Sequence, residues 1–476
     1  MGVVTRAKKM MPLQLDEEEE VLVDRISLLP DGVLEDIVSL LPTRDAARTQ
    51  LLSSRWRHIW RSAPLNLDVD GDPTIPVSDI SRILSTHQHG PGRRFSINYS
   101  CLGYYDDEEE TLDGWLRSPA LDGLRELEIL FDDSHLRWGY PPRPLQAASV
   151  LRFSSTLVVA SFNACAFPDA TTTGGLLHYW PLLKQLTLSY VTVSESSLHA
   201  LLAGCPALES LLLQENNGCP RVRIVSPSLR SIGVGTGFGA GFFTWGDDEL
   251  EELRLVQQLV IEDAPCLEKL VVFEGLEMDI SVVSAPRLKV LGELVGVCHM
   301  LQFGTAALHQ GSTFERLTAV VPSVKVLALS YVKPCSDTAV NLIKCFPHLE
   351  KLYIKITHVV QKNESYDEYQ QLTGTLDIRL RNIVLPYRED SKPGINFAKF
   401  FVTNARLLES MTLELKHGYV GNDAWIRRQH RRLQVKKRAS AHARFDFVSH
   451  ILSPSLPHPE QVHDLSILDP FQRIHH

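Results

Sequence analysis

The sequence contains no apolar run long enough to cross a bilayer and no CxxC pair among its 8 cysteines. Its 48 lysine and arginine residues are outnumbered by 57 aspartate and glutamate residues, and the formal net charge is -9. This balance excludes a surface that is basic throughout, so neither nucleic acid nor a membrane is the expected partner of the whole chain. The opening MGVVTRAKKMMPLQLDEEEE lacks the apolar core of a signal peptide. We therefore expect an intracellular protein, nuclear or cytoplasmic, with reduced and buried cysteines.

The sequence also lacks a nucleophile elbow, a Walker loop and an HExxH zinc helix. The segment VGTGFGAGFF places Gly235, Gly237 and Ala240 in a GxGxxA spacing, which is one feature of dinucleotide sites. Such a site needs a helix that starts there, whereas the residues that follow are poor helix starters and bring negative charge. We predict a loop at this point, and a non-catalytic protein without a cofactor or a bound metal.

A repeated pattern of proline followed by L-x-x-L-x-L, or its valine and isoleucine variants, dominates the chain. Examples are WPLLKQLTL, CPALESLLL, APCLEKLVV and FPHLEKLYI, and the prolines are Pro181, Pro206, Pro227, Pro265, Pro286, Pro322 and Pro347. By subtraction their separations are 25, 21, 38, 21, 36 and 25 residues. Separations in the low twenties are typical of leucine-rich repeats, and the longer gaps are either irregular or contain a degenerate repeat.

This repeat predicts a solenoid in which each unit contributes one short strand. Side chains alternate along a strand, so the last two leucines of each unit point into a common core. Stacked units bury a continuous ladder of leucines that no single unit could bury alone. The other side chains of the strands line a concave face, where a protein target would bind. The candidate target-binding residues are Leu212, Gln214, Val271, Phe273, Tyr353 and Lys355.

A compact helical pattern precedes the repeats. Pro30 suits the start of a first helix and Pro42 ends it. In LLSSRWRHIWRS (51–62) the apolar residues share one helical face; they are Leu52, Trp56, Ile59 and Trp60. This segment is a nucleic-acid-binding helix, a core helix with a solvated face, or a helix that docks on a partner. Three helices in about forty residues bury little core alone, so a neighbour or partner usually completes such a unit.

The C-terminal part differs in composition from the repeats. NARLLESMTLEL predicts a final strand, and the basic run RRQHRRLQVKKR (427–438) predicts the solvated face of an amphipathic helix that caps the solenoid. The alternative is a nucleic-acid- or chromatin-binding helix. The predicted divisions are a disordered lead-in (1–21), the helical unit (22–66), a connecting segment (67–120), the repeats (121–403), a terminal unit (404–450) and a C-terminal tail (451–476).

The stretch LPDGVLEDIVSLLPTRDAARTQLLSSRWRHIW closely resembles the F-box of plant proteins. The repeats resemble the leucine-rich repeats of the same proteins, and NARLLESMTLEL, WIRRQHRRLQ and RASAHARFDF resemble the FBD domain with which many of them end. The resemblance implies an α/β protein: a three-helix F-box, an irregular leucine-rich-repeat solenoid and a basic helical cap. The implied role is that of substrate receptor in an SCF-type ubiquitin ligase.

The resemblance also implies partners and contact residues. The F-box would dock on a Skp-type adaptor, held in turn by a cullin and a RING protein, while the repeats hold an unknown protein target. The residues at the family's adaptor-facing positions are Leu29, Pro30, Leu34, Ile37, Leu40, Leu52 and Trp56. They are apolar, as the core of an interface should be.

The sequence departs from the family pattern in the F-box and differs from some relatives on the concave face. Gly32 stands where the family usually has an acid, and Ala46 and Ala47 replace larger aliphatic residues. These changes weaken the helix start and reduce the buried area, so they bear on adaptor affinity.

Some relatives hold an inositol phosphate, which requires converging lysines and arginines. The outward positions here are mostly neutral apart from Lys355, and we predict no such cofactor.

Overall fold

The structure is a computed structural model that describes most of the 476-residue chain. The described residues are 26, 28–69, 75–87, 90–98, 108–130, 143–145, 147–167, 179–236, 255–275, 278–295, 300–304, 306–309, 320–330, 336–355, 377–415, 422–449 and 460–472. The lead-in predicted for residues 1–21 lies outside these residues. So do Gly237 and Ala240 of the glycine-rich segment.

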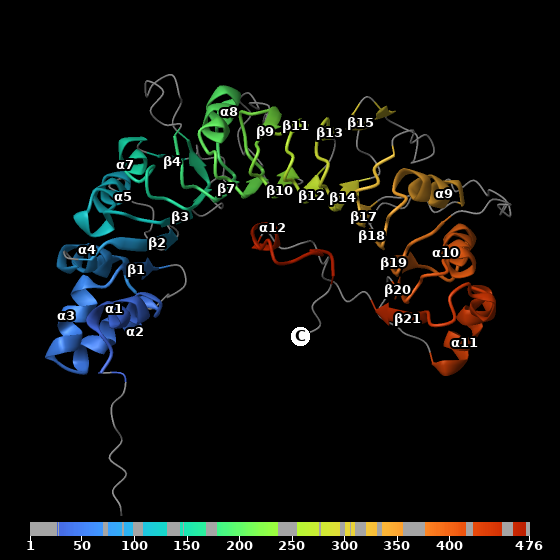
Figure 1. The fold of residues 1–476 in the computed structure, drawn as a ribbon, viewed down its shortest axis with the longest axis horizontal. Coiled ribbons are helices and arrows are strands. Elements are labelled where there is room, and N and C mark those ends of the chain that lie inside the picture. Colours follow the sequence, from blue (N-terminus) through green and yellow to red (C-terminus); the bar gives the residue numbers. More distant parts are fainter. Residues whose placement is uncertain are drawn as a thin grey trace, which may run out of the picture.

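The chain forms an arc whose inner face is a single parallel sheet (Figure 1). This sheet has 14 strands in the order β1-β2-β3-β5-β7-β8-β10-β12-β14-β17-β18-β19-β20-β21. Their bounds are β1 Leu65–Asp68, β2 Gly92–Asn98, β3 Glu126–Leu130, β5 Val159–Asn163, β7 Gln185–Ser189, β8 Ser210–Gln214, β10 Ser231–Thr236, β12 Lys269–Gly275, β14 Val290–Val295, β17 Val326–Ser330, β18 Lys351–Lys355, β19 Asn382–Tyr387, β20 Ser410–Leu415 and β21 Arg444–Ser449.

Each repeat places its leucines as the pattern predicts. In the unit CPALESLLL, Leu208 comes from the turn and Leu211 and Leu213 come from β8, and all three are buried. Their equivalents in neighbouring units join them in one continuous hydrophobic core behind the sheet. The leucine ladder is therefore the main apolar core of the protein.

The outer face of the arc carries helices near its ends and strands at its centre (Figure 1). The helices are α4 Val77–Thr86, α5 Glu108–Leu116, α7 Ala147–Leu151, α8 Glu195–Ala203, α9 Ser336–Cys345 and α10 Lys392–Asn404. The central strands form a second sheet: β9 Arg221–Val225, β11 Gln258–Asp263, β13 Asp279–Val282, β15 Met300–Phe303 and β16 Ala306–His309. Strands β9 and β13 lie in the two shortest repeats, where an extended strand spans the return path with fewer residues than a helix needs.

Among the described residues, the two long gaps between prolines contain no additional inner strand. Strand β10 pairs directly with β12, and β14 pairs directly with β17. The residues between these strands include members of the outer sheet. The gaps are therefore irregular extensions of a repeat.

The three predicted N-terminal helices are α1 Asp31–Ser39, α2 Thr43–Arg48 and α3 Ser54–Ser62, with a short 3-10 turn, η1 Thr49–Leu51, before the last. Trp56, Ile59 and Trp60 of α3 are buried, whereas Arg57 and Arg61 on its other face are exposed. The buried residues of this unit belong to the same core as the leucine ladder. The tryptophan segment is thus a core helix with a solvated face, and the solenoid is the neighbour that completes its core.

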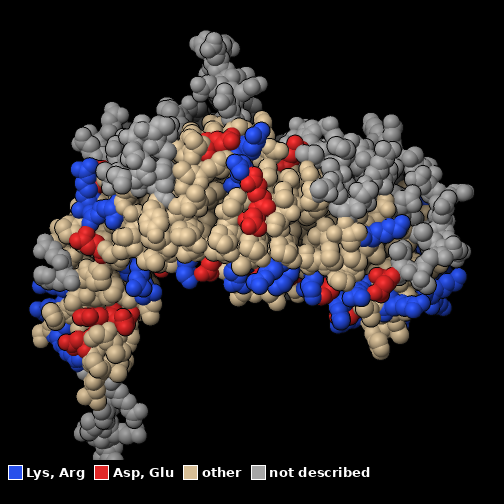
Figure 2. Space-filling view, turned by 45° about the horizontal axis from the view of Figure 1, so that its top comes forward, with Lys and Arg blue, Asp and Glu red and all other residues tan. Residues whose placement is uncertain are grey.

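The opposite end of the sheet is closed by α11 Asp423–Arg432 and the short turn η6 Val435–Lys437. Leu433 and Val435 are buried in the core, and Trp425 and Ile426 pack against it. The basic side chains of the run 427–438 are exposed, and lysine and arginine gather at this end of the arc (Figure 2). The structure therefore shows a basic helical cap.

The structure differs from the predicted divisions at two places. The sheet starts at β1 and includes β2, so the solenoid extends into the segment 67–120 that the sequence suggested was only a connection. The predicted tail contains a helical turn, α12 Glu460–His463, which lies within the hollow of the arc (Figure 1). Both differences arise from pairing or packing with residues distant in the sequence.

Replacing Gly32 by alanine is expected to raise the free energy of unfolding by up to about 1 kcal/mol, because glycine loses more backbone entropy than alanine in a helix. Gly32 is exposed in the first turn of α1, and no atom lies within 4 Å of the position its Cβ would take. Urea unfolding followed by circular dichroism measures the change. Gly92→Ala is the matched control and should destabilise, since its Cβ would lie 2.8 Å from the backbone of Leu121. A Gly32→Ala variant less stable than the wild type would contradict this account.

Candidate protein-interaction surfaces

The three-helix unit exposes a set of aliphatic side chains. We call it the N-terminal apolar surface. Leu52 is 66% exposed, Leu40 64% and Ile37 39%. The surface consists of Ile26, Leu28, Val33, Ile37, Leu40, Leu51 and Leu52. So many exposed aliphatic side chains in so small a unit are typical of a surface that a partner covers.

The seven residues predicted to face an adaptor divide into two groups. Pro30, Ile37, Leu40 and Leu52 are exposed and Leu29 is half-buried. Leu34 and Trp56, by contrast, are buried in the core. These two therefore hold the helices in place and do not present a side chain to a partner.

Sequence reasoning missed part of this surface. Val33, Ile37 and Leu40 recur at i, i+4 and i+7, which is itself a helical stripe. Helix α1 has apolar residues on two faces: Leu34 and Val38 are buried, and this stripe is exposed. The exposed pair Leu51 and Leu52 precedes α3.

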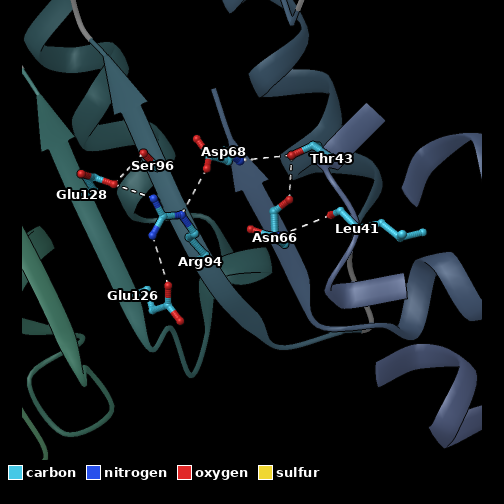
Figure 3. Close-up of polar contacts among 8 residues, drawn as sticks. All are labelled: Leu41, Thr43, Asn66, Asp68, Arg94, Ser96, Glu126 and Glu128. Atoms are coloured by element: carbon cyan, nitrogen blue, oxygen red, sulfur yellow. Dashed lines mark hydrogen bonds and ion pairs between the residues drawn. The ribbon is translucent and has the colours of Figure 1, made fainter. Parts of the chain in front are cut away.

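Hydrogen bonds as well as the shared core join the three-helix unit to the first strand (Figure 3). The Thr43 hydroxyl donates to the carbonyl of Asn66 at 2.7 Å and accepts from the backbone N–H of Asp68 at 3.1 Å. The Asn66 side chain donates to the carbonyl of Leu41. The N-terminal apolar surface is therefore held in a fixed orientation relative to the concave face.

The concave face next to this junction is polar (Figure 3). Arg94 of β2 lies between three carboxylates: its guanidinium is 3.3 Å from Asp68, 3.2 Å from Glu126 and 2.6 Å from Glu128. The Ser96 hydroxyl donates to Glu128 at 3.0 Å. Three acids around one base leave this part of the concave face with net negative charge.

The centre of the concave face is apolar. A second hydrophobic cluster lies there, separate from the main core on the other side of the sheet. Its members on the sheet are Leu212, Val271, Phe273, Val290, Val326 and Ala328, with Tyr353 packed against them. We call this set of residues, together with Gly233, the concave groove.

The concave groove is occupied by residues 460–472, which we call the C-terminal segment. Val462 of α12 is fully buried there. It lies over Gly233, where a Cβ would be 2.6 Å from the Val462 side chain, 2.8 Å from Phe273 and 3.0 Å from Leu212. The missing side chain of Gly233 thus forms the pit that accepts Val462.

His463 is held between two hydroxyl groups. Its Nδ1 lies 2.6 Å from the hydroxyl of Ser210 and its Nε2 lies 2.7 Å from the hydroxyl of Thr187. Burial, together with the positive charge of Lys269, lowers the pKa of His463 to about 4. The imidazole is therefore neutral when the segment is docked near neutral pH.

Lys269 of β12 binds the turn that follows α12. Its Nζ donates to the backbone carbonyls of Asp464 at 2.7 Å, Ile467 at 3.1 Å and Gln461 at 3.4 Å. The Lys269 side chain is buried, and burial lowers its pKa. A cation beneath the carbonyls at the end of a helical turn is a favourable arrangement.

The far end of the C-terminal segment is held by an acid and an aromatic ring. The Asp469 carboxylate accepts from Lys351 Nζ at 2.7 Å and from the Tyr353 hydroxyl at 2.8 Å. Phe471 is buried, with its ring centroid 5.9 Å from that of Tyr353. Burial raises the pKa of Tyr353, and the adjacent Asp469 raises it further. The segment is thus anchored at both ends of the concave groove.

These contacts change the interpretation of the predicted target-binding residues. All six lie on the concave face, but Leu212, Val271 and Phe273 are buried, and Tyr353 is in contact with the C-terminal segment. Gln214 is half-buried. The prediction took the whole face to be open. In the structure, a target can reach Leu212, Val271 and Phe273 only when the C-terminal segment has left the concave groove.

The basic residues of the concave face have partners within the chain. Lys355 lies 2.5 Å from Glu293, Lys351 is bound to Asp469, and Arg94 is surrounded by acids. A polyanion would have to compete with each of these ion pairs. This supports the expectation that no inositol phosphate binds here, which stays a prediction.

Other candidate sites receive little support. Cys205 and Cys345 are buried, as predicted, and burial raises the pKa of each thiol to about 12. Within the described ranges, no three His, Cys, Asp or Glu side chains cluster closely enough to hold a metal ion. No described helix has the length and apolar character that a membrane-spanning segment requires.

The fold defines a class: a leucine-rich-repeat solenoid protein with an N-terminal three-helix unit that exposes aliphatic side chains. Comparison with protein families identifies both parts. Residues 26–68 match the F-box domain, and residues 112–354, just over half of the chain, match the leucine-rich repeats of "FBD-associated F-box protein At5g56370". The chain belongs to the family of plant F-box proteins with FBD-associated leucine-rich repeats. Neither match describes an enzymatic domain.

Individual relatives come from Arabidopsis thaliana. The chain is 32% identical to "F-box/LRR-repeat protein At3g03360" over 40% of its own length and 38% of the relative. It is 28% identical to "F-box/LRR-repeat protein 13" over 52% of its own length and 51% of the relative, and 28% identical to "FBD-associated F-box protein At1g66310" over 47% and 48%. The chain spans about half the length, or less, of these relatives.

The C-terminal segment is expected to dock less firmly as the pH falls from about 6.5 towards 4. Docking lowers the pKa of His463, so the docked state binds fewer protons than the undocked state. Acid therefore favours the undocked state, and the docked state has its full stability only above the ordinary histidine pKa. The docking equilibrium should weaken at least about tenfold by pH 5. Amide hydrogen exchange of residues 460–472 measures it.

His463→Gln is the control for this titration, since it keeps a hydrogen-bonding side chain that does not titrate. Thr187 and Ser210, which face the imidazole from β7 and β8, are neutral, and Lys269 is the charged group beside it. Equal pH dependence of exchange in the variant and the wild type would refute the assignment to His463.

Proposed function

We propose that this protein is the substrate-recognition subunit of an SCF-type cullin–RING ubiquitin ligase. In this role the F-box docks on a Skp-type adaptor, and through it on a cullin and a RING protein. The leucine-rich repeats hold a protein target for ubiquitination. The observation that carries the proposal is the N-terminal apolar surface, which lies on the part of the chain that matches the F-box.

The chemistry of this surface suits an adaptor. Its aliphatic side chains gain by leaving water, at about 25 cal/mol for each Å² of apolar area buried. Leu40 and Leu52 are its most exposed members among the residues at the family's adaptor-facing positions. A charged pair lies in the same unit: Arg55 of α3 is 2.6 Å from Asp31, the first residue of α1. An apolar centre with a polar rim is the usual anatomy of a protein interface.

The rigid connection of the F-box to the solenoid suits a receptor. The three helices share a core with the repeats, and Thr43 links them to β1. A target bound to the solenoid therefore takes a defined position relative to the adaptor. The receptor contributes by raising the effective concentration of the target at the transfer site, and catalysis belongs to its partners.

The alternative function uses the basic helix α11 to bind nucleic acid or chromatin. Its exposed arginines are compatible with that role, but the apolar face of the same helix closes the core. This alternative stays a prediction, as does the nuclear or cytoplasmic location. Its mark would be an affinity that falls steeply with salt and is lost when the charges of 427–438 are reversed.

The Leu40→Asp and Leu52→Asp double variant is expected to lose capture by a Skp-type adaptor while keeping its fold, since both side chains are exposed. Placing two charges in a desolvated interface should reduce capture by at least about a hundredfold. Co-purification with a plant Skp-type adaptor, with circular dichroism on each sample, measures this. Leu34 is unsuitable for the test because it is buried, so a charge there would unfold the unit.

Leu407→Asp is the matched control. Leu407 is an exposed leucine in the turn before β20, far from the F-box in the sheet order, and its replacement should leave capture unchanged. Failure of the folded wild type to capture the adaptor would refute the proposal. Gly32, Ala46 and Ala47 would then be the residues to replace with those of the family pattern.

A further inference from the structure

The apolar side chains of the concave groove are covered by the C-terminal segment, and they take no part in the leucine ladder. The leucine ladder lies on the opposite side of the sheet and forms its own continuous core. Strands β8 and β17 nevertheless bury side chains on both faces, whereas β3 and β7 alternate buried and half-buried residues. Apolar side chains on the second face gain nothing from the solenoid core. Their cover is Val462 and Phe471, which come from a separate segment near the end of the chain.

Gly233 supports the same conclusion independently. Glycine in the interior of a strand weakens the strand, so it usually marks a place where another chain or a ligand approaches closely. Any side chain at this position would overlap Val462, and the other two close atoms belong to Phe273 and Leu212, which are themselves part of the groove. The pit at Gly233 fits one small branched aliphatic side chain.

The contact made by the C-terminal segment resembles that of a short peptide on a domain more than that of a core element. Val462 and Phe471 are buried, but Asp464, Ser466 and Leu468 are exposed, and Leu468 is 75% exposed. The other contacts of the segment are polar, and the residues that make them are Thr187, Ser210, Lys269, Lys351 and Tyr353. A segment whose anchors are separated by exposed residues, and which is not paired into the sheet, can open locally while the sheet stays intact.

We propose that the concave groove is a binding site for a short linear segment of a partner protein, and that the chain's own C-terminal segment occupies it until such a partner displaces it. The partner segment has a helical turn with a branched aliphatic residue, followed by an acid and, two residues after the acid, an aromatic ring. These features correspond to Val462, Asp469 and Phe471. The binding site itself does not depend on the proposed receptor function. Only the statement that the bound partner is a ubiquitination target rests on that function.

The groove dictates each element of this pattern. The aliphatic residue fills the pit over Gly233, and a turn that ends above Lys269 satisfies its ammonium group with backbone carbonyls. Lys351 and the hydroxyl of Tyr353 require an acid. The Tyr353 ring requires an apolar or aromatic neighbour. A basic segment would meet two buried or half-buried lysines and is excluded.

The test uses a fluorescein-labelled synthetic peptide of residues 460–472 and the full-length protein. The wild type should bind the peptide weakly, because its own segment competes at an effective concentration in the millimolar range. The Val462→Asp and Phe471→Ala double variant frees the groove without altering it, and should bind the peptide at least tenfold more tightly by fluorescence anisotropy.

Two controls define the site and the partner class. Adding Gly233→Val to the double variant should abolish binding, because valine fills the pit. A peptide carrying Asp469→Lys and Phe471→Ala should bind neither protein. Tight binding of the peptide despite Gly233→Val, or equal binding of both peptides, would overturn the proposal.

Hydrogen exchange of the wild type provides a measurement that needs no variant. Residues 460–472 should exchange faster than β8, β10 and β12, since the segment opens while the solenoid stays folded. Exchange at the same rate as those strands would overturn the proposal, because the segment would then be a fixed part of the fold. Adaptor capture measured on the same samples tests the proposed receptor function separately from the proposed groove, since capture depends on the F-box and not on the groove.

Discussion

The structure depends on one constraint: a leucine-rich unit can bury its leucines only against the units on either side of it. The parallel sheet therefore grows until something that is not a repeat closes each end. The three F-box helices close the first end by contributing Trp56, Ile59 and Trp60 to the same core as the ladder. Helix α11 closes the other end with Leu433. The docking unit and the solenoid are consequently one folded body, and the F-box cannot swing freely on a linker.

Local patterns in the sequence were sufficient to predict much of this. The period of the proline-leucine pattern predicted the strands and their buried residues, and the basic composition of 427–438 predicted the terminal helix. Residue-level assignments on the F-box were less successful, because α1 has apolar residues on two faces and only tertiary packing decides which is covered. Leu34 and Trp56 were assigned to the partner surface, yet they lie in the core.

The occupied concave groove could not be predicted, for a different physical reason. Val462 and Gly233 lie far apart in the sequence, and neither is unusual in its local context. The signal that was available was the uninterrupted apolar character of strands such as VLALS (326–330), which an exposed face would not need. A continuous apolar run on an inner strand indicates burial on both faces. It does not indicate which part of the chain supplies the cover.

The strands on the outer face of the central repeats have a geometric consequence. Neighbouring inner strands are about 4.8 Å apart, whereas packed helices need about 10 Å, so each helix-backed repeat is a wedge that bends the solenoid. Strands β9, β11, β13 and β15 have the same spacing as the strands they back, and those repeats have parallel sides. Curvature is therefore concentrated towards the two ends of the arc (Figure 1). The concave face is straighter in the middle, which suits a ligand that lies across several strands.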